Sequence, residues 1–387
     1  MKKFEPQAPD REAKLIPNPQ ETPILQDAKP IENMEQRLPD YTVEIYFGVH
    51  GTAEDVKGAE EDTPKASLDK FRRRGLAESF KKADVYVPEL HGWAESSLIQ
   101  LQELSYGRIT PDQLLAETRS EMISNMKVLK GKTILKPEEI PRLEDDPMFG
   151  FKKSQIDMIY KSYKPIVIFD VPQEDPRSEV LHNHVLGKSK EQPSRQATFE
   201  KTLATIKVNL RTTADLHNER EDYMLSQLTP KLEEVFKQRP DLKNKPNLRV
   251  LMFLGAVHTR MAQMMSKYGI QVESRHSRSP HIFGFSNEAH RRLALGKEVS
   301  NELAAKVLLE KLCLELMGPV VTNLTDDNNE VGAFIRKIVN VFTYEEIKYL
   351  YGLEMSSAIL EFFSYLGKKK INPPRDHTEL ISFLSNK

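Results

Sequence analysis

The sequence predicts an α/β protein with a mostly parallel sheet flanked by helices, a helical C-terminal region and a disordered N-terminal tail. Two apolar runs, residues 43–49 and 248–254, carry this prediction. Each is typical of a buried parallel strand, ends near a glycine and a histidine, and precedes a helical pattern. The third observation is that residues after about 288 show helical spacing only.

The N-terminal half begins with a tail, residues 1–40, rich in proline, glutamate, glutamine and lysine. Such a composition buries too little apolar surface to order a chain. A strand at 43–49, a helix at 65–82 and a short strand at 83–89 then predict one parallel strand–helix–strand unit. A helical stretch follows from 95 to 130.

The middle of the chain opens with a continuous apolar run, 165–170, which predicts a third buried strand. Residues 172–196 are polar and contain prolines, so they predict a long loop. A long helix follows from 197 to about 228, with Pro230 starting its successor. Two more strands, near 248–254 and 269–274, enclose a short helix.

These elements divide the chain into three parts. Residues 1–40 form the tail, 41–287 the α/β domain, predicted to be catalytic, and 288–387 a helical subdomain or layer. The helical part is interrupted at Gly318-Pro319 and at Pro373-Pro374, which are strong helix breakers.

Composition narrows the functional classes. Lysine and arginine total 56 against 57 acidic residues, so the net charge of -1 gives no support to nucleic acid or an anionic membrane as the main partner. The single cysteine, Cys313, excludes an intramolecular disulfide and lies in an apolar segment, where we expect it to be buried. No run approaches the roughly 18 apolar residues of a membrane span, and no secretory signal is visible, which predicts a cytoplasmic protein. Export without a signal stays open.

Three polar side chains follow strand ends. His50 and His258 come after the two apolar runs, and Glu89 ends the strand that follows His50 along the chain. Loops at the carboxyl ends of parallel strands gather in one crevice, where ligands bind. We therefore expect the three side chains to meet at one edge of the sheet. Gly255, three residues before His258, allows close backbone approach there.

The long helix carries charged residues at the end of an apolar stripe that runs from Leu203 to Leu216. Continuing that stripe places Glu219 or Arg220, and then Tyr223, on the inward face. A buried charge needs a partner, since unpaired burial costs several kcal/mol. Two interpretations stay open: an internal ion pair that fastens the helix to the sheet, or an arginine delivered into the crevice to stabilise negative charge.

Together these residues resemble a known family, the TraB/PrgY group of the erythromycin-esterase/ChaN-like superfamily, which includes the TIKI metalloproteases. The resemblance covers residues 43 to 275, roughly 60% of the chain. It rests on His50, Glu89, the helix segment Glu219-Arg220-Glu221-Asp222-Tyr223-Met224, and Gly255-Ala256-Val257-His258. Two positions depart from the family pattern: Phe47 replaces the usual glycine, and Val171 stands where relatives often have an arginine.

The resemblance implies a hydrolase that cleaves a peptide or ester bond, with His50, Glu89, Glu219, Arg220 and His258 in its site. In one mechanism His50, Glu89 and His258 bind Mn, Co or Zn, and the metal lowers the pKa of its bound water to about 7. In the other a His–Glu pair activates water without metal. In both, Arg220 stabilises the oxyanion and Glu219 orients it or a histidine.

Two other classes use the same scaffold. The first is a ligand-binding protein without turnover, since relatives bind haem or a peptide signal. The second is an interaction or effector protein that engages partner proteins through the tail or the C-terminal helices. For the hydrolase, we expect a small-molecule or peptide substrate.

Overall fold

The structure is a computed structural model that describes residues 41–48, 56–57, 75–130, 142, 144, 149–185, 190, 197–276, 284–325 and 328–385. The predicted tail, 1–40, and the candidate residue His50 lie outside these residues.

The described part contains a four-stranded, all-parallel sheet with strand order β2-β3-β1-β4. Its strands are β1 (Tyr41–Gly48), β2 (Val85–Val87), β3 (Leu248–Gly255) and β4 (Gln271–His276). The predicted α/β class with a parallel sheet is therefore confirmed. The two strands predicted to form one strand–helix–strand unit, β1 and β2, are parallel but not neighbours, because β3 lies between them.

The predicted third strand, 165–170, is not a full strand. It runs beside β2 through one parallel bridge, in which Tyr86 N donates to Pro165 O over 3.0 Å and Val167 N donates to Tyr86 O over 2.9 Å. Pro165 has no N–H to extend the ladder. The segment still ends at the same edge of the sheet as the strands beside it.

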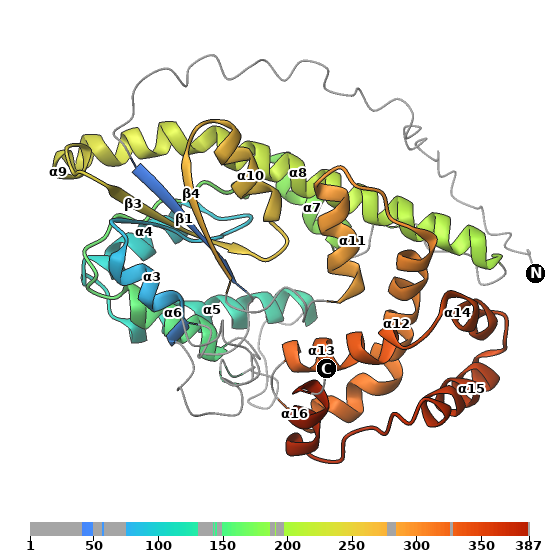
Figure 1. Cartoon of the computed structure of the whole chain (residues 1–387). Helices are drawn as coiled ribbons and strands as arrows, with labels where there is room; N and C mark the ends of the chain where they lie inside the picture. Colours follow the sequence, from blue (N-terminus) through green and yellow to red (C-terminus); the bar gives the residue numbers. More distant parts are fainter. Residues whose placement is uncertain are drawn as a thin grey trace, which may run out of the picture. The chain divides into compact units, whose positions relative to one another are not determined.

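The helices of the α/β part surround the sheet (Figure 1). They are α3 (Leu76–Lys82), α4 (Glu95–Ser105), α5 (Pro111–Lys130), α6 (Phe149–Ile159), α7 (Pro176–Val185), α8 (Phe199–Gln238), α9 (Pro240–Lys243) and α10 (Thr259–Lys267). Two predictions fail here. Residues 172–196 contain α7 instead of forming only a loop, and α8 continues through Pro230 instead of ending near 228.

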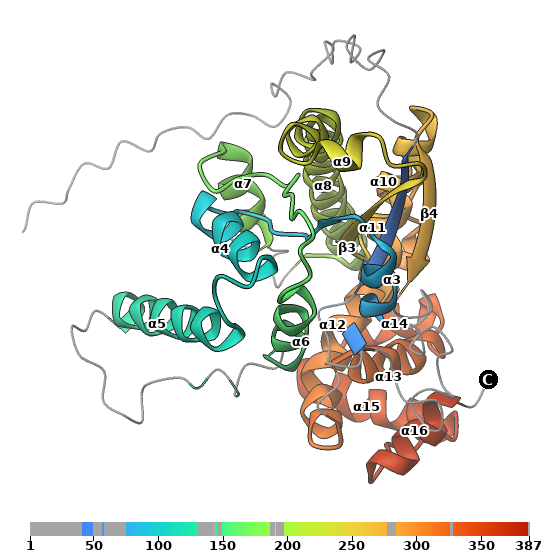
Figure 2. The ribbon, with the colours of Figure 1, turned by 90° about the vertical axis from the view of Figure 1, so that its left-hand side faces the viewer.

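The two faces of the sheet are buried under different helices, because successive side chains of a strand point to opposite faces. On one face, Val43, Ile45 and Phe47 of β1 share a core with the second half of α8 and with α10. On the other face, Tyr46 of β1 and Phe253 of β3 share a core with α3, α4 and α6. Figure 2 shows α4, α5 and α6 as a group on one side of the strands.

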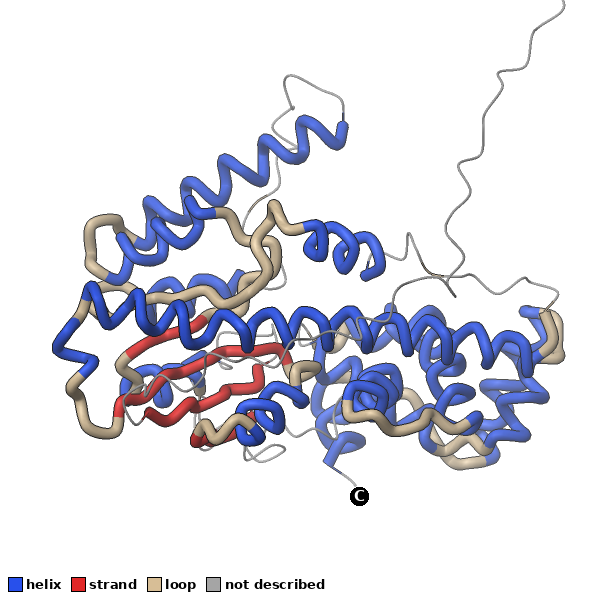
Figure 3. Tube along the Cα trace, turned by 90° about the horizontal axis from the view of Figure 1, so that it is seen from above, coloured by secondary structure: helices blue, strands red, loops and turns tan. Residues whose placement is uncertain are grey.

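The C-terminal helices are α11 (Phe285–Ala294), α12 (Asn301–Thr322), α13 (Asn328–Asn340), α14 (Tyr344–Tyr351), α15 (Met355–Lys368) and α16 (His377–Ser385). They form a separate core that includes Cys313, which is buried as predicted, and the first half of α8. Helix α8 thus runs from the helical core to the sheet (Figure 3). None of the helices in the described ranges is both long and apolar enough to cross a membrane.

Candidate functional site

The carboxyl end of the sheet brings distant parts of the chain together. The last residues of β1 and β3, Gly48 and Gly255, lie opposite each other, and Ala256 N donates to Gly48 O over 3.1 Å. Glu89 follows β2 by two residues, and His258 stands as the N-cap of α10. The predicted meeting of Glu89 and His258 at one edge is therefore observed.

Arg220 reaches this edge from α8 and joins the polar side chains there. Its Nε and Nη2 donate to the two carboxylate oxygens of Asp170 over 2.8 and 2.5 Å. The same Nη2 donates to Glu89 Oε1 over 2.8 Å, and Nη1 lies 3.2 Å from His258 Nε2. The Arg220 side chain is 6% exposed, so this is a buried, bidentate ion pair with a second carboxylate attached.

His258 has a partner on each ring nitrogen. Its Nδ1 lies 3.1 Å from Glu221 Oε1, and its Nε2 lies 3.2 Å from Glu89 Oε1. Arg260 approaches the same Glu221, with Nη1 3.9 Å from Oε2. Because the His258 side chain has no solvent exposure, these carboxylates set the orientation of the imidazole.

Gly255 permits the approach of Glu89. Its backbone N–H donates to Glu89 Oε2, and a Cβ at this position would stand 3.1 Å from that oxygen. Such a contact is closer than a methyl group and an oxygen normally tolerate, so a larger residue would push Glu89 away. The expected close approach at Gly255 is therefore made by a site carboxylate.

Loop pairing places Asp170 beside Glu89. Trp93 Nε1 donates to Asp170 O over 2.8 Å, and Gly92 N donates to Val171 O over 2.9 Å. These bonds join the loop after β2 to the loop after the extended segment. The two carboxylates on either side of Arg220 are thus fixed by backbone contacts as well as by the guanidinium.

The charges of the cluster are set by competition between burial and neighbours. Burial alone would raise the pKa of Glu89, but the charges of His258 and Arg220 and the Gly255 N–H hold it well below its ordinary value. Burial alone would lower the pKa of Arg220, yet its bonds to Asp170 and the charge of Glu89 raise it. Glu89 is therefore ionised and Arg220 cationic across the usual pH range.

His258 is protonated at neutral pH. Burial and Arg220 lower its pKa, but the charge of Glu89 and the hydrogen bonds to Glu221 and Glu89 raise it to about 9. The imidazolium also offsets the negative charge of the cluster: the buried carboxylates of Glu89, Asp170 and Glu221 face the cations Arg220 and His258, while Arg260, 3.9 Å from Glu221, pairs over 2.9 Å with the exposed Asp222. A neutral His258 would leave a larger buried net negative charge.

Two further imidazoles lie behind His258. The His217 ring centroid on α8 is 5.5 Å from that of His258 and 4.9 Å from that of His290 on α11. Burial, and then the charge of His258, lowers the pKa of His217 to about 2 and that of His290 to about 4. Both rings are therefore neutral where His258 is charged.

Stability should consequently peak near pH 6.5 and fall on both sides. Below pH 6.5 the unfolded chain protonates His217 and His290 while the folded chain does not, so acid favours unfolding. For His290 alone, the free energy of unfolding should fall by about 1.4 kcal/mol for each pH unit below 6.5, down to its folded pKa of about 4. His258 acts in the opposite sense: its contribution is complete below pH 6.5 and is lost as the pH rises through about 9. Urea unfolding from pH 4.5 to 10 measures this curve.

Two variants separate the acid and alkaline sides of the stability curve. His290→Gln should make the loss of stability below pH 6.5 less steep and leave the loss at alkaline pH in place. His258→Asn should make the loss at alkaline pH less steep. The stability contribution of Glu89 is present above its unfolded pKa and is lost only at lower pH, because its folded pKa is depressed. Equal slopes for wild type and both variants would contradict these assignments.

The structure separates the predicted site residues. Glu89, Arg220 and His258 come together, whereas Glu219 is exposed on α8 and does not join the cluster. The carboxylate of α8 that contacts the histidine is that of Glu221. His50 lies outside the described residues, so its convergence with His258 stays a prediction.

Two carboxylates of the cluster were not predicted as site residues. Asp170 ends an apolar run just as Glu89 does, and this shared position was the signal for it. Glu221 adjoins Arg220 on the helix, and nothing in the sequence pattern distinguishes it from Glu219. Both are buried, with Asp170 1% and Glu221 2% exposed.

The predicted metal ligands are only partly described. Among residues 41–48, 75–130 and the later described ranges, no group of three or more His, Cys, Asp or Glu side chains is placed to hold a metal ion. Glu89 and His258 already use their oxygens and nitrogens on Arg220, Gly255 and Glu221. As placed, this pair does not fit a metal, because a cation there would also face the guanidinium.

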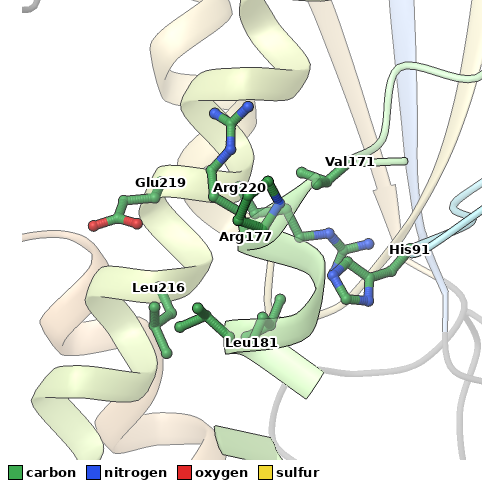
Figure 4. A pocket seen from close by; sticks show the side chains of 9 residues that line it. His91, Val171, Arg177, Leu181, Leu216, Glu219 and Arg220 are labelled. Carbon is green, nitrogen blue, oxygen red and sulfur yellow. The ribbon is translucent and has the colours of Figure 1, made fainter. Parts of the chain in front are cut away.

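A cavity of about 140 Å³ adjoins the cluster between α7, α8 and the loop after β2 (Figure 4). His91 and Arg220 line it on the cluster side, and Figure 4 shows the Glu219 carboxylate pointing away from both. The cavity thus gives a ligand a place next to Arg220.

No protein-family model, curated protein or solved structure matches this chain. The resemblance to the TraB/PrgY group therefore stays a prediction that rests on its own residues.

Proposed function

We propose that this protein is a hydrolase that cleaves an ester or peptide bond at the cluster of Glu89, Arg220 and His258. The observation that carries the proposal is that Glu89 contacts both the Arg220 guanidinium and the His258 imidazole, at the carboxyl end of a parallel sheet and beside a cavity. Ligand sites of open α/β folds lie at this end. The resemblance to a superfamily of peptidases and esterases supports the bond type.

The charges suit one sequence of proton transfers. Of Glu89 and His258, only Glu89 has a solvent-exposed side chain, at 12%. Glu89 takes a proton from a water whose oxygen attacks the carbonyl carbon. Nε and Nη2 of Arg220 donate three N–H groups to Asp170 and Glu89. Nε2 of the His258 imidazolium is itself a donor and accepts nothing from Nη1, so an N–H on Nη1 is left to donate to the oxyanion.

The step ends with proton return. As the bond between the carbonyl carbon and the leaving group breaks, His258 Nε2 gives its proton to the leaving oxygen or nitrogen. The protonated Glu89 then returns its proton to His258 across their 3.2 Å contact, which restores the starting state. No step runs through a metal, since Glu89 and His258 would first have to release their present partners.

A panel of p-nitrophenyl esters and fluorogenic peptides tests the proposal on the purified full chain. We expect turnover above the buffer rate, and a rate that falls as the pH rises through about 9, where His258 loses the proton it donates. No acid limb is expected near the ordinary carboxylate pKa, because Glu89 stays ionised below it. Activity that is lost on chelation and restored by Zn, Mn or Co would replace this mechanism with the metal-dependent one.

A binding protein without turnover is the second candidate, and the complete burial of His258 favours it. In that case the ion cluster serves as structural support for the cavity. Ligand binding that persists in His258→Asn, with no turnover in the panel at any pH, would establish this candidate and contradict the hydrolase.

A further inference from the structure

The cavity beside Arg220 has an apolar wall. Val171, Pro176, Val180, Leu181 and Leu216 line it, from α7, α8 and the loop before α7. An engineered apolar cavity of about 150 Å³ holds one benzene molecule. At about 140 Å³, this cavity therefore has room for an apolar group of about that size.

Of the four polar residues that line the cavity, His91 and Arg220 stand on its cluster side, and Arg177 and Glu219 are the other two. His91 lines it, and its buried Nε2 has no hydrogen-bond partner among the residues that the structure describes. Arg220 lines it too, and its Nη1 retains an N–H that Asp170 and Glu89 do not use. A ligand oxygen at this end would meet two donors, provided that His91 carries its proton on Nε2.

Both arginines that line the cavity already have carboxylate partners. Arg177 pairs with Asp175 over 2.5 Å and lies 4.4 Å from the centre of the Tyr223 ring. Arg220 is balanced by Asp170 and Glu89. Neither arginine of the described lining is left over for an anionic ligand, and the Glu219 carboxylate also belongs to that lining, so the pocket suits an uncharged group with one hydrogen-bond acceptor.

We propose that this cavity binds an uncharged acyl group of about four to six carbons, aliphatic or phenyl, with its carbonyl oxygen towards His91 and Arg220. If the proposed hydrolysis is right, on which this assignment of the acyl side rests, the cavity selects the substrate by the length of its acyl chain. Each methylene that enters an apolar pocket contributes about 0.8 kcal/mol, or roughly a fourfold gain in kcat/KM.

A chain-length series tests this proposal. We expect kcat/KM for p-nitrophenyl acetate, butyrate, hexanoate and decanoate to rise to the butyrate or hexanoate and then to fall. Leu216→Trp, which fills the cavity from α8, should move the optimum to the acetate. Val180→Phe narrows the cavity from a residue that is 52% exposed, so it should do the same without disturbing the fold. Val208→Trp is the matched control. Val208 lies on α8, as Leu216 does, and is 53% exposed, so this variant should leave the chain-length optimum unchanged.

A binding arm separates this proposal from the proposed function. Phenylacetamide, an uncharged amide, is titrated into ¹⁵N-labelled protein, and its binding should weaken at least tenfold in Leu216→Trp and Val180→Phe but not in Val208→Trp. Binding with this pattern and no turnover supports the cavity and contradicts the hydrolase. If the protein turns over esters but kcat/KM does not depend on chain length, or depends on it equally in wild type and both cavity variants, the cavity does not bind the acyl group. The proposed hydrolase activity would then still stand. If neither binding nor turnover is observed, both proposals are overturned.

Discussion

Replacing Arg220 by methionine is expected to lower the free energy of unfolding by about 3–5 kcal/mol, the cost of removing one partner from a buried ion pair. The substitution leaves Asp170, whose side chain has no exposure, without its two guanidinium bonds. It also removes the cation that holds Glu89. Urea unfolding at pH 6.5, where stability should peak, measures the change.

Arg177→Met provides the control. Arg177 also makes a short arginine–carboxylate pair, with Asp175, but its side chain is 45% exposed. Exposed pairs contribute about 0–1 kcal/mol, so this variant should unfold close to wild type. Equal midpoints for Arg220→Met and Arg177→Met would show that the Arg220 pair is not buried as described.

A double substitution shows what kind of stabilisation is involved. Replacing both partners, Arg220→Met with Asp170→Leu, removes the uncompensated charge and should recover part of the loss, since buried pairs are often replaceable by apolar residues. Little recovery would indicate that Glu89 and His258 also depend on the guanidinium for their positions. Of the two interpretations of the charged helix stripe, the internal ion pair is observed, and the functional arginine stays a prediction.

The strand ends could be predicted because their signals are local. An apolar run that stops at a glycine or a carboxylate marks the edge of a parallel sheet, and this was enough to bring Glu89 and His258 together. The strand order could not be predicted. The insertion of β3 between β1 and β2 is a pairing across more than 150 residues, and the pattern within a strand carries no information about its neighbour.

The helix residues show a different limit. The stripe from Leu203 to Leu216 lies on a segment that begins in the helical core, and the same spacing predicts Glu219 or Arg220, and then Tyr223, on the inward face; of the first two, Arg220 is buried and Glu219 is exposed. Beyond that segment α8 packs on the sheet instead, and its buried face there contains Arg220, Glu221, Met224 and Leu225. The change of packing partner shifts the buried face, and so Glu221 takes the place expected of Glu219. A single helical period cannot report such a change.

Replacing Glu89 by glutamine is expected to reduce kcat/KM on the best ester of the panel by about 10²–10⁴-fold, the usual contribution of a positioned general base. Glutamine keeps the size of the side chain and an oxygen for the Gly255 N–H, but it cannot take a proton from water. The rate must be compared per folded molecule, because the variant also weakens a buried pair with Arg220.

Glu44→Gln is the matched control for buried charge. Glu44 lies in β1, is 2% exposed, and pairs with Arg249 and Arg275 over 3.2 and 2.9 Å, away from the carboxyl end of its strand. This variant should lose stability and keep its turnover per folded molecule. If both variants lose activity only in proportion to their unfolded fraction, Glu89 has no role in the chemistry.

The imidazole of His258 gives a readout that needs no substrate. Of the groups that raise its pKa to about 9, Glu89 has the largest effect, so Glu89→Gln should lower that pKa while Glu44→Gln leaves it in place. Titration of the ¹⁵N-labelled imidazole measures it directly. A His258 pKa that stays about 9 in Glu89→Gln would mean that the carboxylate and the imidazolium are not in contact, and the proton return from Glu89 to His258 would then have no path.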